Sequence, residues 1–416
     1  MGILATQKVS AQAGEFVCGN LIESTALAKA ADLPKTTKVW SGKLKALIFR
    51  ISFTDGAYSI DTSTINRTNT SINALFRSMS RNTFQWEFSI YPTILPAPGD
   101  QATYAANFTN LQSWITSQIT AAGLKRGIDY DVYIASFPNL TLGWAGLSNM
   151  RDADWINGNY SSAVTAHELG HSMGLPHAHS IEAGTDMFGT PGSTSQTNEY
   201  GNPYDVMGHG GSTAHFNVLY KLRVGWEDAD EIKEVKTSGV YRIYAQDNAV
   251  HKGRLIGIRL PSANPNFGYW FEYRTLSPSA RLGASVLFQG FKSATNLDSW
   301  YLDTTPNSKT SNDENDGVLV SGKEFKDKYG EVTFKTLAIN TNVWNEEGWV
   351  DLQVTIPSST AIVPKAHPPS ALTQQSGTDF FFNLQGKVVS PTCFKLPTLK
   401  VIQTEQGKAT LSLLVH

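Results

Sequence analysis

The residues most able to do chemistry follow the pattern H-E-x-x-H-x-x-G-x-x-H. They are His167, Glu168, His171, Gly174 and His177. On a helix, His167 and His171 project from one face about one turn apart, which suits two imidazoles that bind the same Zn²⁺. Gly174 can end that helix at a positive φ, so the reversed chain can bring in His177 as a third ligand.

Three protein ligands leave the fourth zinc position open, which is typical of a catalytic zinc site and not of a structural one. Glu168 has no metal role in this pattern. Its carboxylate can take a proton from a water whose pKa zinc has lowered, and then give that proton to the leaving amine. These residues predict zinc-dependent hydrolysis of peptide bonds with Glu168 as general base. We expect His179 to lie at the rim of the site, because a fourth ligand would close it.

A second motif, Tyr204-Asp205-Val206-Met207-Gly208, follows about 30 residues later. With the histidine motif, the chain resembles the metzincin zinc peptidases, and more narrowly the gametolysin/autolysin-like group and its immune-inhibitor-A-like relatives. The resemblance is strong over residues 160–226 and weaker over the rest of 44–356. It implies a metzincin catalytic domain, with a twisted mixed sheet, an active-site helix and a Met-turn. It also implies that Met207 supports the zinc site by packing and does not bind the metal.

The chain departs from this family at one position. Some metzincins have a tyrosine two residues after the turn methionine, where it can stabilise the transition state, whereas this chain has His209. Three alternatives follow: Tyr204 takes that role, His209 itself donates to the oxyanion, or zinc alone polarises the carbonyl.

The two cysteines, Cys18 and Cys393, are too few for a disulfide scaffold. Cys18 precedes Gly19, and Cys-Gly segments in some metzincin propeptides hold the enzyme latent through a thiolate on the zinc. The alternatives are a disulfide between Cys18 and Cys393, or an inert thiol.

The elements that must position these residues alternate along the first half of the chain. Apolar patterns predict strands at Lys45–Phe53, Phe84–Tyr91 and Tyr130–Phe137, and helices at Thr62–Arg81 and Asn107–Ala122. We therefore expect an α+β fold in which helices pack on a mixed sheet. An edge strand near Leu140–Leu147 is expected to hold an extended protein or peptide substrate by β-augmentation.

The second half of the chain has short β-like runs separated by Gly, Pro, Asn and Asp, which predicts an all-β module. Ser358–Pro369 is rich in proline and predicts a linker. The expected division is an N-terminal arm or pro-like segment (1–43), a zinc peptidase domain (44–235), a sandwich-like β module (236–357), and a linker with a short C-terminal β segment (358–416). The acidic stretch Asp313–Gly317 is either a Ca²⁺ site or a solvated turn.

Composition excludes several classes of protein. Lys and Arg (34) nearly balance Asp and Glu (36), so the net charge of −2 gives no electrostatic case for nucleic acid. No apolar run is long enough for a transmembrane segment. We expect a secreted protein whose signal peptide has been removed.

Two functions from different classes remain. The first is a zinc endopeptidase that acts on protein substrates, with a C-terminal module able to bind a cell-wall or matrix polymer. The second is an adhesion or binding protein whose zinc domain is a silent scaffold. The intact motif His167, Glu168, His171 and His177 favours the first.

Overall fold

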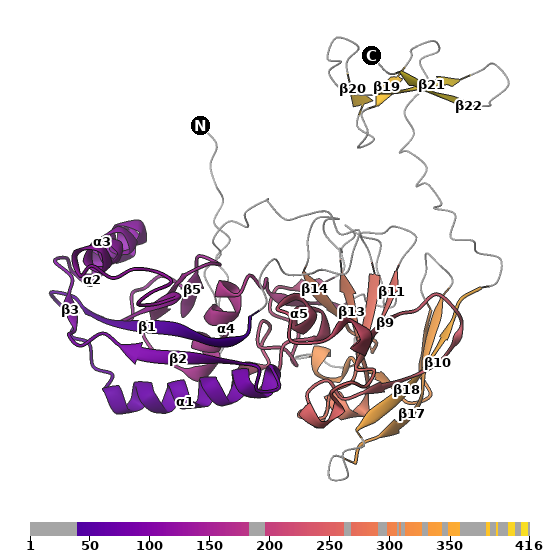
Figure 1. Cartoon of the computed structure of the whole chain (residues 1–416), viewed down its shortest axis with the longest axis horizontal. Coiled ribbons are helices and arrows are strands. Elements are labelled where there is room, and N and C mark those ends of the chain that lie inside the picture. Colours follow the sequence, from indigo (N-terminus) through magenta and orange to yellow (C-terminus); the bar gives the residue numbers. More distant parts are fainter. Residues whose placement is uncertain are drawn as a thin grey trace. The chain divides into compact units, whose positions relative to one another are not determined.

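The computed structural model describes residues 40–182, 196–261, 268–289, 298–305, 308, 313–326, 332–342 and 348–357, together with four C-terminal strands. The chain divides into two compact units, residues 1–363 and 364–416 (Figure 1). The fold is mixed, with several sheets and few helices. Among the described residues, no helix is both long and apolar enough to span a membrane.

The first sheet contains the strands that the sequence predicts in the first half of the chain. Its strand order is β2-β1-β4-β6-β5, and all neighbours are parallel except β5, which runs antiparallel to β6 at one edge. The short strand β3 (Leu95–Pro96) also pairs with β1. The strands are β1 (Gly42–Ser52), β2 (Phe84–Ile90), β4 (Val132–Phe137), β5 (Gly146–Ser148) and β6 (Ala153–Asn157).

Helices cover both faces of this sheet. Alternate residues of β4 point to opposite faces, so Ile134 packs in one core with α1 (Thr62–Met79), and Tyr133 packs in another with α3 (Phe108–Ala121). A short helix, α2 (Gln101–Ala106), precedes α3. The predicted helices are confirmed, with ends that differ from the expected ones by one or two residues.

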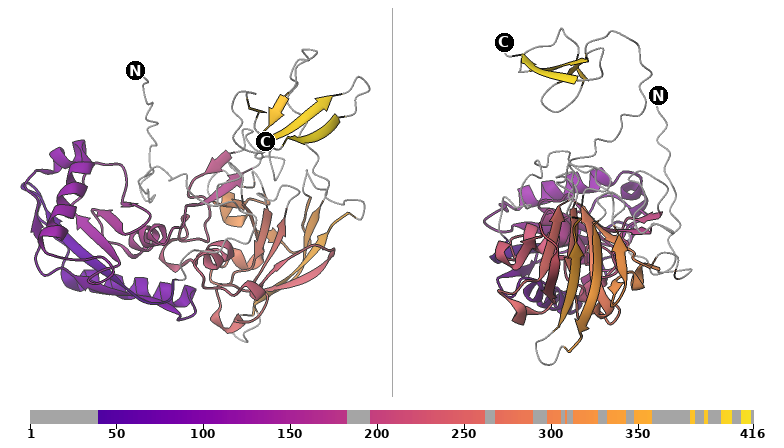
Figure 2. Two further views of the ribbon diagram at one scale, coloured as in Figure 1. Left: turned by 45° about the horizontal axis from the view of Figure 1, so that its top comes forward. Right: turned by 90° about the vertical axis from the view of Figure 1, so that its right-hand side faces the viewer.

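Two further helices lie between the first sheet and the rest of the unit (Figures 1 and 2). Helix α4 (Ser162–Ser172) carries the histidine motif, and α5 (Val218–Arg223) follows the Met207 turn. Leu169 of α4 and Leu219 of α5 belong to the same core as α1.

The second half of the unit consists of two sheets that share a core of aromatic and aliphatic side chains. The order of the larger sheet is β8-β7-β14-β13-β12-β11-β9, with β15 beside β13. Its strands are β7 (Ala178–Glu182), β8 (Gln196–Asn198), β9 (Ile232–Glu234), β11 (Gly257–Pro261), β12 (Gly268–Glu272), β13 (Gly283–Gln289), β14 (Ser299–Leu302) and β15 (Leu319–Val320). The smaller sheet contains β10 (Gly239–Tyr244), β18 (Trp349–Thr355), β17 (Thr333–Asn340) and β16 (Glu324–Lys326).

The larger sheet crosses the domain boundary that the sequence predicts at residue 235. Strands β7, β8 and β9 come before that residue, yet they pair within this sheet, and β7 lies parallel to β14. Residues 44–235 and 236–357 therefore share a hydrogen-bonded sheet inside one compact unit. The pairing of β7 with β14 joins segments that are far apart in sequence, so no local sequence pattern predicts it.

The C-terminal unit contains a four-stranded antiparallel sheet of order β20-β19-β21-β22. Its strands are β19 (Phe380–Phe382), β20 (Val388–Val389), β21 (Thr398–Gln403) and β22 (Ala409–Leu414). Cys18 and Cys393 lie outside the described residues, so neither latency nor a disulfide is tested.

Candidate metal centre

Helix α4 begins and ends through local interactions that its sequence encodes. The Ser161 hydroxyl caps the N-terminus by accepting a hydrogen bond from the Val164 amide. At the other end Gly174 has φ of 84°, as predicted, and the Leu175 amide bonds back to the Gly170 carbonyl at 3.1 Å. The chain then reverses and returns His177 toward the helix.

This turn brings three histidines together. His167 and His171 lie one turn apart on α4, with ring centroids 4.8 Å apart, and the His177 ring is 4.7 Å from that of His171. One ring nitrogen from each of the three lies within 4.8 Å of the others. Within the described residues, this is the one group of three or more His, Cys, Asp or Glu side chains close enough to hold a metal ion.

Each of these rings is oriented by a hydrogen bond at Nδ1. The partners are the Val206 carbonyl for His167 (2.8 Å), the Leu175 carbonyl for His171 (2.7 Å) and the Glu199 carboxylate for His177 (3.0 Å). Carbonyl and carboxylate oxygens accept hydrogen bonds, so Nδ1 carries the hydrogen and Nε2 keeps its lone pair. Three neutral imidazoles that present Nε2 atoms suit a divalent ion such as zinc.

Burial keeps the His167 and His171 rings neutral. It lowers the pKa of His171 to about 3, with a further contribution from the neighbouring His177, and lowers the pKa of His167 well below its ordinary value. Neutral imidazole is the form that binds a metal.

We expect the metal-free chain to lose stability as the pH falls from about 6.5. The pKa of His171 is about 3 in the folded chain against an ordinary 6.5. Between these values the unfolded chain binds a proton that the folded chain does not, so acid favours unfolding. Urea denaturation of EDTA-treated protein at about pH 7.5 and about pH 5 measures the difference, and His171→Gln should reduce it. An equal pH dependence in both proteins would contradict this origin.

Glu168 is fully buried beside the edge strand of the first sheet. A Cβ atom built on Gly146 of β5 would lie 2.3 Å from Glu168 Oε1, so the carboxylate packs directly against the Gly146 backbone. The sequence motif does not reveal this contact, because Gly146 precedes the helix on another element.

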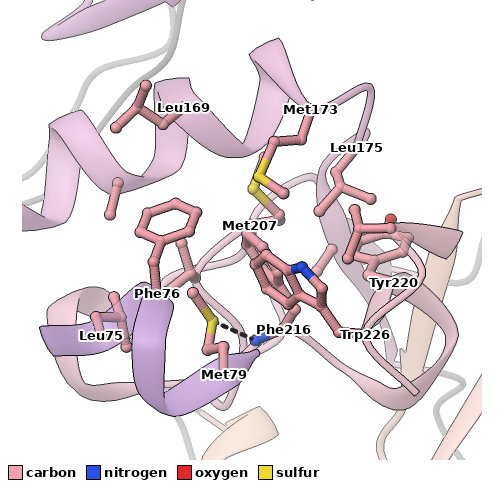
Figure 3. Packing of buried hydrophobic residues seen from close by; sticks show 14 of the residues in the cluster. Leu75, Phe76, Met79, Leu169, Met173, Leu175, Met207, Phe216, Tyr220 and Trp226 are labelled. Carbon is pink, nitrogen blue, oxygen red and sulfur yellow. Dashed lines mark hydrogen bonds between the residues drawn. The ribbon is translucent and has the colours of Figure 1, made fainter. Parts of the chain in front are cut away.

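Met207 lies beneath α4 within the hydrophobic core (Figure 3). A Cβ atom on Gly170 would lie 2.3 Å from Met207 Sδ, so a glycine is needed where the turn meets the helix. The Met207 carbonyl also accepts a hydrogen bond from the Ala178 amide at 2.8 Å, directly after His177. Met207 thus packs against the helix that carries two of the histidines, and its supporting role at a zinc site stays a prediction.

A buried charged network that the sequence does not reveal holds the Met207 turn. Asp205 accepts hydrogen bonds from the amides of Met207 (2.8 Å) and Asn217 (2.6 Å). Arg274, from the chain just after β12, donates to the Tyr204 and His215 carbonyls and to the Glu272 carboxylate, and lies 3.9 Å from Asp205. The larger β-sheet is therefore tied to the metal-site turn.

The two candidate transition-state donors, Tyr204 and His209, are both hydrogen-bonded to other parts of the chain. The Tyr204 hydroxyl donates to the Asn315 carbonyl at 2.7 Å, so it is directed to the acidic turn. His209 Nδ1 donates to the Tyr200 carbonyl at 2.8 Å, and its Nε2 is 3.7 Å from Glu314. This geometry does not support either side chain as an oxyanion donor. The aromatic ring that packs against His177 belongs to Tyr200, with centroids 4.4 Å apart, and the motif gave no signal for it.

His179 is buried instead of lying at the rim. Its ring stacks on Trp300 at 4.1 Å, and Nε2 is 3.3 Å from the Asp298 carboxylate. It is not part of the three-histidine group. The pairing of β7 with β14 explains the burial. His179 lies directly opposite Trp300 in this pairing, so the two side chains lie on the same face of the larger sheet.

In the acidic stretch, Asp313 and Asp316 accept hydrogen bonds from the Ser308 hydroxyl at 2.7 and 3.0 Å. The Ser308 hydroxyl is thus a hydrogen-bond donor to two carboxylates of the acidic stretch. The Ca²⁺ site and the solvated turn both remain predictions.

The third histidine is also fixed by the larger sheet. Its carbonyl accepts a hydrogen bond from the Tyr220 hydroxyl (2.7 Å), which in turn accepts one from the Ser299 amide of β14 (3.0 Å). The backbone at His177 thus depends on a strand more than 120 residues away.

Neither the family models nor the curated proteins with which the sequence was compared match it.

Proposed function

We propose that the chain is a zinc-dependent endopeptidase of metzincin type that hydrolyses peptide bonds in protein substrates. The observation that carries this proposal is the three-histidine group, with Nδ1 of every ring bonded elsewhere, next to the buried carboxylate of Glu168. His167, His171 and His177 would hold the zinc ion.

Zinc bound there supplies Lewis acidity, which lowers the pKa of a water and polarises a carbonyl. Glu168 follows His167 directly on α4, so its carboxylate is available to accept a proton from the attacking water and deliver it to the leaving nitrogen. Its burial excludes bulk solvent and so strengthens its electrostatic interaction with the reacting groups.

Substrate binding is supported by the position of β5. This strand forms one edge of the first sheet, and Gly146 contacts Glu168. A peptide that added a strand to this edge would lie next to the general base. In the structure this edge strand spans Gly146–Ser148, which overlaps the end of the predicted range Leu140–Leu147.

The test is cleavage of casein or gelatin by the zinc-loaded chain, with and without 1,10-phenanthroline, beside His171→Asn. Loss of cleavage with chelator and with the variant, and its return on adding zinc, would support the proposal. If the full chain shows no cleavage, the assay is repeated after removal of residues 1–39, which keeps the buried Trp40 and all of β1. If the zinc-bound chain still cleaves neither substrate, the peptidase proposal is refuted and a binding or adhesion protein is favoured.

Gly146→Ala is expected to reduce cleavage strongly, because the new methyl group would occupy the place of Glu168 Oε1. A displacement of about 1 Å at a catalytic group can cost about 10²-fold in rate. The matched control is Gly99→Ala, where a Cβ would meet the Tyr104 ring at 2.9 Å. Measured kcat/KM should fall much further for Gly146→Ala, and equal losses would count against a special role for the Gly146 contact.

A further inference from the structure

Asp154 lies on β6, next to the edge strand β5, and its side chain contacts the C-terminal end of helix α4. It is fully buried, and among the described residues it forms no salt bridge. Burial raises its pKa to about 7, although the hydroxyls of Ser148 and Ser172 act in the opposite direction. Burying a carboxyl group with no paired cation costs free energy. We therefore look for a structural role for Asp154 in its contacts.

The contacts of Asp154 join three elements. The Ser172 hydroxyl, at the C-terminus of α4, donates to Asp154 Oδ1 at 2.9 Å. Ser148 of β5 is the direct cross-strand partner of Asp154, and its hydroxyl reaches the aspartate through the Ser172 hydroxyl. The two serine hydroxyls lie 3.4 Å apart. We call Ser148, Asp154 and Ser172 the serine–aspartate cluster.

This cluster lies on the same side of α4 as the general base. Glu168 and Ser172 are four residues apart, so their side chains leave one face of the helix. Along β5, Gly146 contacts Glu168, and Ser148 joins the cluster two residues later. The edge strand thus touches the helix at two points one helical turn apart, and the cluster forms one of them.

We propose that Asp154 is a positioning residue that fixes the distance between the edge strand β5 and Glu168. This inference depends on the proposed function for its effect on catalysis, because a substrate paired with β5 is aligned to Glu168 only if strand and helix keep their spacing. Asp154 acts through Ser148 and Ser172 and does not touch the reacting atoms.

The experiment compares zinc-loaded Asp154→Ala, Asp154→Asn and wild-type chain. Two quantities are measured: hydrogen exchange of the amides of residues 146–148, and kcat/KM per zinc-loaded molecule. Asp154→Ala is expected to exchange faster at these residues and to lose about 10–100-fold in kcat/KM, since small misplacements of catalytic groups carry such costs. Asp154→Asn keeps the shape and an oxygen acceptor for Ser172, so it should restore both.

Thr336→Val is the matched control. Thr336 is fully buried and donates to the Leu319 carbonyl at 2.6 Å in the β half of the unit, so its loss tests general destabilisation. It should leave exchange at 146–148 and kcat/KM unchanged. A change in both as large as that in Asp154→Ala would overturn the proposal.

Unchanged exchange at 146–148 in a folded Asp154→Ala chain would also overturn it. If that variant does not fold, Ser148→Ala breaks the cluster from the strand side, with the same expectation and the same refuting result. If the wild-type chain has no peptidase activity, the proposed function fails, and the exchange measurement alone decides whether Asp154 holds β5 to α4.

Discussion

Glu168→Gln is expected to lower kcat about 10²–10⁴-fold while zinc affinity stays close to that of the wild type. The amide nearly matches the carboxylate in size, so it should fit the space between α4 and Gly146. It cannot accept a proton from water at neutral pH, so the proton transfers assigned to Glu168 are lost. The measurements are steady-state cleavage of casein and zinc binding by competition with a chromogenic chelator.

Glu199→Ala provides the contrast. Its carboxylate lies 3.0 Å from Nδ1 of His177 and therefore orients a proposed metal ligand. Loss of such a partner typically costs about 10–100-fold in metal affinity or activity. We therefore expect weaker zinc binding for Glu199→Ala, which removes the acceptor, and slower turnover for Glu168→Gln. Substantial turnover by zinc-loaded Glu168→Gln would rule out Glu168 as the general base.

Arg274→Met is expected to lower the free energy of unfolding by about 3–5 kcal/mol. The guanidinium is buried between the Glu272 and Asp205 carboxylates and donates to two backbone carbonyls of the Met207 turn region. Methionine fills part of the volume but leaves both carboxylates in the interior without this cation. Urea denaturation of the zinc-loaded chain measures the loss.

The control for this variant is Arg242→Met. Arg242 pairs with Asp351 at 2.8 Å, but its side chain is 46% exposed, so the loss should stay within about 1 kcal/mol. Arg274→Met should also weaken zinc binding, because its guanidinium holds the turn that supports His167 through the Val206 carbonyl. Equal stability losses for the two arginine variants would contradict the role assigned to the buried network.

The sequence predicts well what local chemistry determines. The four-residue spacing of His167 and His171 and the positive φ of Gly174 depend on a single helix and its end, and the structure has both. The strands and helices of the first sheet were predicted because their apolar periods reflect one buried face each.

Contacts between distant segments were not predictable in this way. The sequence pattern gives no indication that Arg274 reaches Asp205, that Gly146 contacts Glu168, or that Asp154 lies under Ser172. Tyr204 illustrates the same limit. Its position beside the Met207 turn suggested a role at the metal, but its direction is determined by Asn315, a residue from a distant loop.

The parallel pairing of β7 with β14 has a consequence for the order of events during synthesis of the chain. Helix α4 and the first sheet can form as soon as their residues leave the ribosome, but His177 acquires its final backbone position only when Ser299–Leu302 arrive. The roughly 120 residues between them take about 6–24 s to synthesise at about 5–20 residues per second. The nascent chain therefore carries an incomplete three-histidine group until most of the first unit has been made, and the proposed proteolytic activity would begin only after the fold that contains it is nearly finished.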